Sequence, residues 1–334
     1  MATLKDIARQ AGVNISTVSR ALSGSSEINE DTRRRICGIA RELNYIPDLS
    51  ARALTGKGTG LIGLILPEIG SSFYARVVDR VQLELNRRGF SLLIGVTNFR
   101  PDNEIQALNL FAGRKVDGML VTGSMSEEIG RYLERTGTFR HVPVVLMETY
   151  VELQGCESIM IDNGWGIRLA VDYFHACGHR DIGFISEDIS CRQRLPGFRT
   201  ALAEDGLRPV ENWIKTGVER FELGGYLRMK ELLCEEKVPT AVFASYDSMA
   251  FGAMKAILDA GLRVPEDISL IGFDNIRESE FFNRPLTTVS PPVEEMVRLA
   301  AGLLEEKLQG QSAQPGSRRI LKPELVIRES VRKM

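Results

Sequence analysis

Four side chains in a short segment near the start of the chain have the chemistry to read DNA. They are Ile15, Ser16, Ser19 and Arg20, within the run ISTVSRAL. Hydroxyl and guanidinium groups hydrogen-bond to base edges, and one guanidinium can make two such bonds to a guanine. Isoleucine makes no hydrogen bond and can touch only a thymine methyl group. Together these side chains predict a helix that enters the major groove of DNA.

Two short helices and a tight turn must position these side chains. Apolar residues at helical spacing from Leu4 predict the first helix, and Gly12 supplies the positive φ that the turn requires. Asn14 is suited to cap the second helix, whose inward residues are then expected to be Val18 and Leu22. A helical hairpin in an ordinary core has the same pattern, so the sequence that follows must decide between the two.

The sequence after this hairpin predicts a third helix and a segment that cannot fold alone. Asn29 or Glu30 caps the helix, which continues through RRRICGIARELNY until Pro47 ends it. The run DLSARAL then has helical residues but is too short to hold a helix in water. We expect it to become ordered only on a partner.

These segments closely resemble the headpiece and hinge of the LacI/GalR family of bacterial transcription regulators. The matching stretches are TLKDIARQAGVNISTVSRALSG, ELNYIP and ARAL. The resemblance implies that two hinge segments pair in the minor groove of a palindromic operator, where Leu54 of each wedges a base step apart. It also places Ile15, Ser16 and Arg20 at the family's main base-reading positions. The other residues expected to contact DNA are Thr3, Thr17, Ser19, Asn29, Tyr45 and Ala51, of which Asn29 and Tyr45 either hold phosphates or pack the headpiece.

Composition agrees with a protein that touches nucleic acid at one end. Residues 1–60 carry nine Lys and Arg against six Asp and Glu, a net charge of +3, so the remainder carries −5 of the total of −2. Five cysteines, an odd number with no paired spacing, fit reduced thiols. No apolar run is long enough to span a bilayer and no signal peptide precedes the first helix, so we expect a cytoplasmic protein that associates with the nucleoid when bound to DNA.

From Gly60 onward, short apolar strands alternate with amphipathic helices. LIGLILP, FSLLIGV, DGMLVTG and VPVVLME are strands of a first series, and a second series begins after SIMIDN. This alternation predicts an α/β fold of two doubly wound parallel-sheet lobes with a cleft between them. We expect a headpiece over 1–46, a hinge over 47–59 and a core over 60–334. The first lobe is expected to comprise about 60–160 and 288–320, and the second about 161–287 and 321–334.

Ligands in such folds bind at the carboxyl ends of the strands, so residues there are the candidates for a ligand site. The core also resembles the family's regulatory domain, itself similar to periplasmic sugar-binding proteins, through KVDGML, GHRDIGFI, GLRVPEDISLIGFDN and PLTTVSPP. Asp and Arg grip hydroxyl groups, and aromatic faces stack on rings. The expected effector-binding residues are Phe73, Tyr74, Asp162, Trp165, Arg194, Tyr246, Asp247 and Asp274. A structural role competes for each of them. Asp247 can cap the following helix, and Phe73 and Trp165 can be packing residues, whereas we favour Arg194 and Asp274 as ligand groups.

The resemblance implies a homodimeric repressor controlled by a small molecule, most often a sugar or sugar derivative. Relatives that bind galactosides have an asparagine where this chain has Tyr246, and the stretch EDISCRQ is unusual, so no particular effector carries over. A nucleobase or a corepressor remains an alternative, and the sequence leaves open whether the effector induces or corepresses. No leucine heptad near the C-terminus argues for a tetramer, and the choice between dimer and tetramer stays open.

Other classes of protein fit less well. His175, Cys177 and His179 surround the end of a helix and lack a distant fourth ligand, so we expect no metal, and we expect no cofactor. The chain has no nucleotide-binding loop, no nucleophile elbow and only three histidines, which disfavours an enzyme of the doubly wound class. A transport-type sugar-binding protein would need an export signal and no DNA-reading headpiece, which is the reverse of this chain.

Overall fold

The computed structural model describes residues 2–22, 25, 27–45, 58–123, 128–136, 142–149, 155–311 and 316–334. They belong to two compact units, residues 1–59 and residues 60–334. Ala51 and Leu54, which the sequence predicts to contact DNA, lie outside the described residues.

The first unit contains three short helices, α1 (Leu4–Ala11), α2 (Ile15–Leu22) and α3 (Glu30–Glu42). Gly12 ends α1 with a φ of 65°, the left-handed conformation that the sequence predicts for the turn. A small apolar core joins the helices and includes Ile7, Val18 and Ile36. Val18 is buried in α2, as predicted. The other buried residue of this helix is Ala21 rather than the predicted Leu22, which is half-buried.

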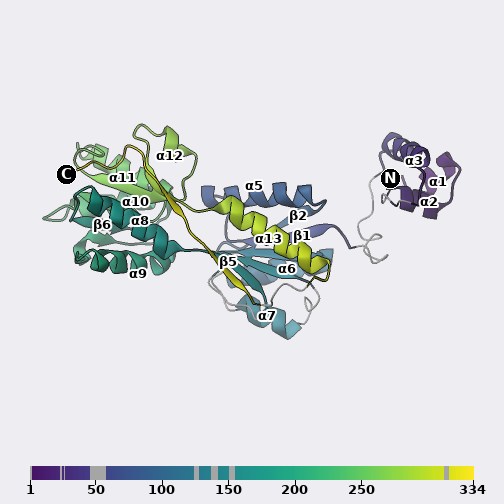
Figure 1. Cartoon of the computed structure of the whole chain (residues 1–334), viewed down its shortest axis with the longest axis horizontal. Helices are drawn as coiled ribbons and strands as arrows, with labels where there is room; N and C mark the ends of the chain where they lie inside the picture. Colours follow the sequence, from purple (N-terminus) through teal and green to yellow (C-terminus); the bar gives the residue numbers. More distant parts are fainter. Residues whose placement is uncertain are drawn as a thin grey trace. The chain divides into compact units, whose positions relative to one another are not determined.

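The first lobe of the core is a six-stranded parallel sheet with the strand order β11-β5-β4-β3-β1-β2. Figure 1 shows α5 and α13 side by side over one face of this sheet. Helices α6 and α7 pack against the other face. Its elements are β1 (Leu61–Leu66), α5 (Ser72–Arg87), β2 (Ser91–Val96), α6 (Pro101–Arg114), β3 (Gly118–Thr122), α7 (Glu128–Thr136), β4 (Val144–Met147), β5 (Glu157–Ile161), α13 (Val293–Leu308) and β11 (Arg318–Leu321).

The second lobe repeats this plan, with the strand order β12-β10-β9-β8-β6-β7 and only β12 antiparallel to its neighbour. Helices α10 and α11 cover one face, and α8 and α9 cover the other (Figure 1). Its elements are α8 (Asn163–Ala176), β6 (Ile182–Ile185), α9 (Asp188–Glu204), the 3-10 turn Glu211–Trp213, β7 (Ile214–Lys215), α10 (Phe221–Leu233), β8 (Ala241–Ala244), α11 (Asp247–Asp259), β9 (Ser269–Phe273), α12 (Glu278–Phe281), β10 (Thr287–Ser290) and β12 (Glu324–Val326).

The chain crosses between the lobes after β5, after β10 and after β11. The second crossing lies slightly later than the sequence predicts, since the first lobe was expected to resume at about residue 288. Strand β10 still pairs with β9 and β12 of the second sheet, so the return begins at Pro291. Because several segments join the lobes, a change in the angle between them must bend all of these crossings together.

Helix α9 begins nine residues earlier than the sequence predicts. From the sequence we expect this helix over 197–205, directly after Pro196, since proline favours the beginning of a helix. In the structure the helix starts at Asp188, capped by the Glu187 carboxylate, and Pro196 lies inside it. This extension matters because the added turns face the gap between the lobes.

Among the described helices, none is long and apolar enough to cross a membrane.

Candidate functional site

The exposed face of α2 presents the predicted DNA-reading side chains. Ile15, Ser16, Ser19 and Arg20 are all exposed, and Ile15 keeps 42% of its surface in contact with solvent although it is apolar. Thr17 is half-buried at the side of the same helix. Ile15 is the first residue of α2, so its exposed side chain lies beside the polar side chains of Ser16 and Ser19 and is free to contact a partner.

Three other predicted DNA contacts, Thr3, Asn29 and Tyr45, have local structural roles. Thr3 and Asp6 form a reciprocal cap at the start of α1, and the hydrogen bonds from Thr3 lower the pKa of the Asp6 carboxyl. Asn29 caps α3 by accepting the Asp31 N–H at 2.8 Å. Tyr45 packs partly buried against the headpiece core. Arg20 forms an exposed ion pair with Glu27 at 3.1 Å, and a base contact has to replace that ion pair.

A pocket of about 740 Å³, part of it open to solvent, lies between the two lobes of the core. Its lining comes from the carboxyl ends of strands in both lobes and from the helices that follow them. The first lobe and the crossings contribute Ser71, Phe73, Tyr74, Phe99, Gly123, Glu148, Ile161 and Pro291. The second lobe contributes Asn163, Ile189, Ser190, Gln193, Arg194, Arg220, Phe221, Tyr246, Phe273 and Asp274.

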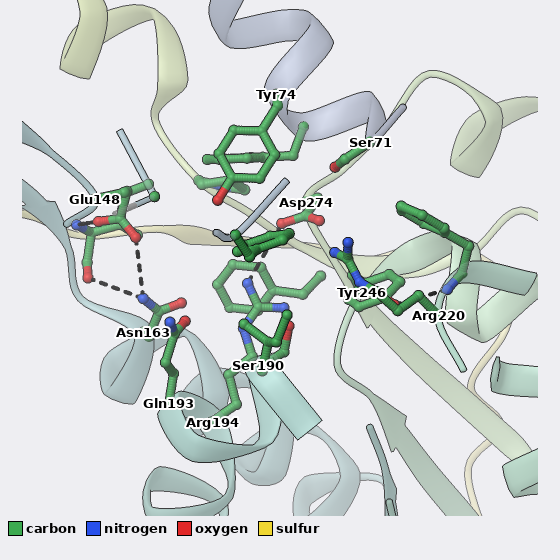
Figure 2. A pocket seen from close by; sticks show the side chains of 18 residues that line it. Ser71, Tyr74, Glu148, Asn163, Ser190, Gln193, Arg194, Arg220, Tyr246 and Asp274 are labelled. Atoms are coloured by element: carbon green, nitrogen blue, oxygen red, sulfur yellow. Dashed lines mark hydrogen bonds and ion pairs between the residues drawn. The ribbon is translucent and has the colours of Figure 1, made fainter. Parts of the chain in front are cut away.

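Arg194 and Asp274 lie together on the second-lobe side of the pocket (Figure 2). The guanidinium stacks on the Phe273 ring at 3.8 Å from the ring centroid, and its Nη2 lies 3.6 Å from Asp274 Oδ1. Its Nε and Nη1 atoms are buried and have no hydrogen-bond partner among the described residues. Asp274 has a φ of 103°, a rare conformation for a residue with a side chain, and burial raises its pKa to about 6.

Glu148 faces this pair from the end of β4 in the first lobe. Its carboxylate accepts the N–H of Ile161 and, at 3.4 Å, the side-chain N–H of Asn163. Both partners lie at the first crossing between the lobes, so Glu148 is tied to a segment that moves when the lobe angle changes. Burial raises the pKa of Glu148 to about 7.

Arg220 connects the lobes at the mouth of the pocket. It comes from the start of α10 and forms two hydrogen bonds to the Glu68 carboxylate, of which the Nη2 to Oε1 distance is 2.8 Å. Its guanidinium also lies against the rings of Phe99 and Phe221. The hydroxyl oxygen of Tyr246 accepts the Phe221 N–H at 2.9 Å, and burial raises the pKa of Tyr246 to about 12.

Five of the eight residues predicted to bind an effector line the pocket, and three do not. Phe73, Tyr74, Arg194, Tyr246 and Asp274 are in its wall. Asp162 instead caps α8 by accepting the Trp165 N–H at 2.9 Å. Trp165 lies outside the pocket with 40% of its surface exposed, beside the Lys322 ammonium.

Asp247, the third, is fully buried beneath the pocket. Its carboxylate accepts hydrogen bonds from the Ile276 N–H, the Ser279 hydroxyl and the Thr288 hydroxyl. These partners hold the turn after β9, where Asp274 has its positive φ. The residue therefore supports the pocket without lining it, since strained backbone persists only where its surroundings fix it.

The pocket lining includes several residues that are not among the predicted effector-binding residues. Ser190 and Gln193 belong to the early turns of α9, which were not predicted to be helical. Glu148, Arg220 and Phe221 follow β4 and β7, and the rule that ligands bind at strand ends applies to them as well. That rule, applied to every strand rather than to selected ones, is the signal that would have found them.

Comparison with known proteins now defines the family. The headpiece, residues 3–48, matches the bacterial regulatory proteins of the lacI family, and residues 171–331 match a periplasmic binding protein-like domain. An HTH-type transcriptional repressor PurR from Vibrio parahaemolyticus is 34% identical over 341 residues, with 100% of each chain covered. The chain belongs to the LacI family. Both the family and the fold class predicted from the sequence are confirmed.

Solved structures of bacterial transcription regulators are similar to this chain over nearly its full length. A lac repressor dimer bound to operator and the anti-inducer ONPF has a TM-score of 0.86 at 27% identity, with 99% of each chain covered. The transcriptional regulator CelR in complex with cellobiose has a TM-score of 0.72 at 30% identity, with 99% of this chain and 100% of that chain covered. This LacI-family protein is accordingly a DNA-binding transcriptional repressor and not an enzyme.

Proposed function

We propose that this LacI-family protein binds a palindromic operator as a homodimer and that a small-molecule effector in the pocket between the core lobes controls this binding. The observation that carries the proposal is the pocket itself. Its wall combines side chains from both lobes, so a ligand there contacts both sides of the hinge and favours one lobe angle over another. The repressor then acts in the cytoplasm, at the nucleoid.

In the proposed complex α2 reads the major groove. Arg20 is the candidate for a guanine contact, Ser16 and Ser19 contact bases or phosphates, and Ile15 packs on a thymine methyl group. Leu54 of the hinge wedges a central base step apart in the minor groove, and Ala51 of the same hinge also contacts the DNA. One headpiece offers few base contacts, which is why two tethered headpieces and a palindromic site are needed.

Exposed apolar side chains on the core support a dimer. Leu83 lies on α5 in the first lobe, while Leu223, Leu258 and Phe281 lie on or at the ends of α10, α11 and α12 in the second. Phe281 keeps 72% of its surface exposed, and contact with a second copy of the chain would remove this apolar surface from water. We propose that α5 and these second-lobe helices form the dimer face.

We propose a sugar or sugar derivative as the effector. Arg194, Asp274, Gln193 and Asn163 bring donors and acceptors to one small space, and aromatic rings flank it. Adjacent hydroxyls of a sugar each donate and accept, so they match such a mixed lining. The CelR structure, which holds cellobiose, agrees with this class.

A nucleobase is the second candidate effector. Two observations favour it. Repressors named PurR resemble this chain over their full length, and the Arg194 guanidinium lies over the Phe273 ring in a pocket lined by six aromatic side chains. A planar base can stack between such groups and hydrogen-bond through its edge. The two candidates differ in shape, so a binding assay separates them.

The experiment starts with thermal unfolding of the full chain in the presence of sugars and nucleobases, since a ligand that binds only the folded state raises the Tm. Each compound that raises the Tm is then added to a fluorescence anisotropy titration of operator DNA. Release of the operator identifies an inducer, and tighter binding identifies a corepressor. A compound that raises the Tm without changing operator affinity in either direction contradicts effector control.

A further inference from the structure

The charges around the pocket are not those of an anion-binding site. Two guanidinium groups, of Arg194 and Arg220, lie in its wall, and each already has a carboxylate partner. Arg220 is held by both oxygens of Glu68, and Arg194 faces Asp274. Neither guanidinium therefore offers an uncompensated positive charge to a ligand.

Two further carboxylates make the balance negative. Glu148 faces the pocket from the first lobe with only 9% of its surface exposed. Glu187 lies buried behind the start of α9, where it accepts the N–H groups of Ile189 and Ser190, and its charge contributes to the raised pKa of Tyr246. The positive charge of Arg76, on α5, lowers the pKa of Asp274. The Arg76 guanidinium is itself paired with Glu294 through hydrogen bonds of 3.1 and 2.6 Å.

The Arg194 guanidinium nevertheless has donors that no acceptor in the described part of the chain satisfies. Arg194 has two buried donors, Nε and Nη1, with no partner among the described residues, while the carboxyls of Asp274 and Glu148 lie close by as acceptors. A ligand must therefore supply acceptors to the arginine and donors to the acids. A hydroxyl group does both, and so does the edge of a free base with a ring N–H beside a carbonyl or ring nitrogen.

We propose that the pocket selects an uncharged ligand that carries donors and acceptors side by side, and that Glu148 and Asp274 exclude its phosphorylated or carboxylated derivatives. This inference rests on the proposed effector site and specifies its chemistry. It favours a free sugar over a sugar phosphate and a free base over a nucleotide. An anion about 5 Å from one carboxylate would lose affinity by a factor on the order of 100 in a partly buried site.

The raised pKa values of the two acids agree with this assignment. Burial is the main cause for both, and it brings the pKa of Glu148 to about 7 and that of Asp274 to about 6. A second negative charge in the pocket would raise both pKa values further, so binding of an anion would be coupled to proton uptake by these acids and would weaken as the pH rises.

Inorganic phosphate tests the exclusion without knowledge of the natural effector. The full chain and the variants Glu148→Gln and Asp274→Asn are unfolded thermally at a pH above 7 with low concentrations of phosphate, against chloride of equal ionic strength. Glu236→Gln removes one exposed carboxylate elsewhere and is the matched control. We expect no specific rise of Tm in the wild type or in the control, and a rise in each pocket variant that corresponds to at least ~10-fold tighter phosphate binding.

Every outcome decides the proposal. A phosphate response in the wild type as strong as in the pocket variants overturns it, and so does the absence of a response in all four proteins, because the acids would then not be what excludes the anion. Each pocket variant serves alone if the other does not fold.

A second arm compares the binding of D-glucose with that of D-glucose 6-phosphate, of D-ribose with that of D-ribose 5-phosphate, and of adenine with that of AMP to the wild type. Tighter binding of any phosphorylated member also overturns the proposal.

Failure of the proposed function would look different. The phosphate arm uses no effector and no DNA, so it can succeed even if no compound changes operator affinity. Conversely, an effector that releases the operator but carries a phosphate would support the proposed function and overturn the exclusion.

Discussion

Glu68 of the first lobe and Arg220 of the second form an ion pair that joins the two lobes beside the pocket. The Arg220 Nη2 to Glu68 Oε1 distance is 2.8 Å, and a second hydrogen bond links the same two groups. Both side chains are more than two-thirds buried, and the carboxylate raises the pKa of the guanidinium. The pair therefore contributes to the preference for the lobe angle seen in this structure.

Glu68→Gln should weaken this connection. We expect the free energy of unfolding of the core to fall by about 1–3 kcal/mol, because the Arg220 guanidinium keeps its burial and loses its countercharge. Denaturant unfolding measures the loss. Glu211→Gln, which breaks the exposed Arg199 pair, is the control and should show no measurable change. Equal losses in the two variants would show that the link between the lobes adds nothing to stability.

Asp274→Asn should abolish the effector response while it leaves DNA binding intact. The amide cannot act as the charged partner of Arg194, and its NH₂ group places donors where the ligand is expected to donate. Calorimetric titration of an effector found by thermal unfolding should show at least ~10-fold weaker binding. The operator affinity of Asp274→Asn without effector should match that of the wild type. Asp259→Asn, on the surface of α11, is the control and should have the same operator affinity. A variant that responds at the usual effector concentration would remove Asp274 from the site.

Glu148 should make the stability of the core depend on pH. Its pKa is about 7 in the folded protein against an ordinary value of 4.5, so between these values the folded state binds more protons than the unfolded state. Stability then falls as the pH rises from about 4.5 to about 7 and levels off above that range. Glu148→Gln keeps an acceptor for the Ile161 N–H. The variant should reduce the loss in the free energy of unfolding over this pH range by up to about 3 kcal/mol.

Urea unfolding at several pH values tests that prediction. Asp247, with a pKa raised to about 7, and Asp274, with a pKa raised to about 6, contribute in the same direction, so the variant should have a smaller slope and not a flat profile. The exposed substitution Glu236→Gln should leave the wild-type slope in place. A slope that Glu148→Gln does not change would mean that this carboxyl titrates alike in both states.

Arg20→Ala should weaken operator binding by about 1–3 kcal/mol at fixed salt and relax the preference at one base position. Arg208→Ala removes the same charge from an exposed site in the second lobe and should leave the affinity unchanged. Anisotropy titrations against operators that differ at single positions measure both effects. A uniform loss across all sequences would instead assign Arg20 to a phosphate.

Much of the fold could be predicted because the hydrophobic pattern carries it. Apolar runs such as LIGLIL and AVFA are buried on both sides, so their alternation with helices implies parallel sheets covered by helices. The start of α9 could not be predicted, since Pro196 disfavours a helix locally and only the Glu187 cap and tertiary packing extend it backward to Asp188. Ser190 and Gln193 were missed from the pocket for this reason.

The site could be predicted only in part, because strand ends are readable and side-chain partners are not. Asp247 and Asp274 are both acids that follow strands, so the position of each at a strand end predicts a ligand contact for both. The structure separates them: Asp274 lines the pocket, whereas Asp247 is surrounded by Ile276, Ser279 and Thr288, which come from distant parts of the chain. No local pattern records such pairings.

The most direct test of effector control is the operator affinity of the full-length protein with and without a compound that raises its Tm. The operator is selected from random DNA by the protein itself, and the wild type is compared with Asp274→Asn by fluorescence anisotropy at fixed salt. Effector control through the pocket predicts that the compound changes the operator Kd of the wild type by about 5- to 150-fold and leaves that of the variant unchanged. A compound that binds the wild type and leaves its operator Kd unchanged, or that changes it equally in both proteins, would contradict control through this pocket.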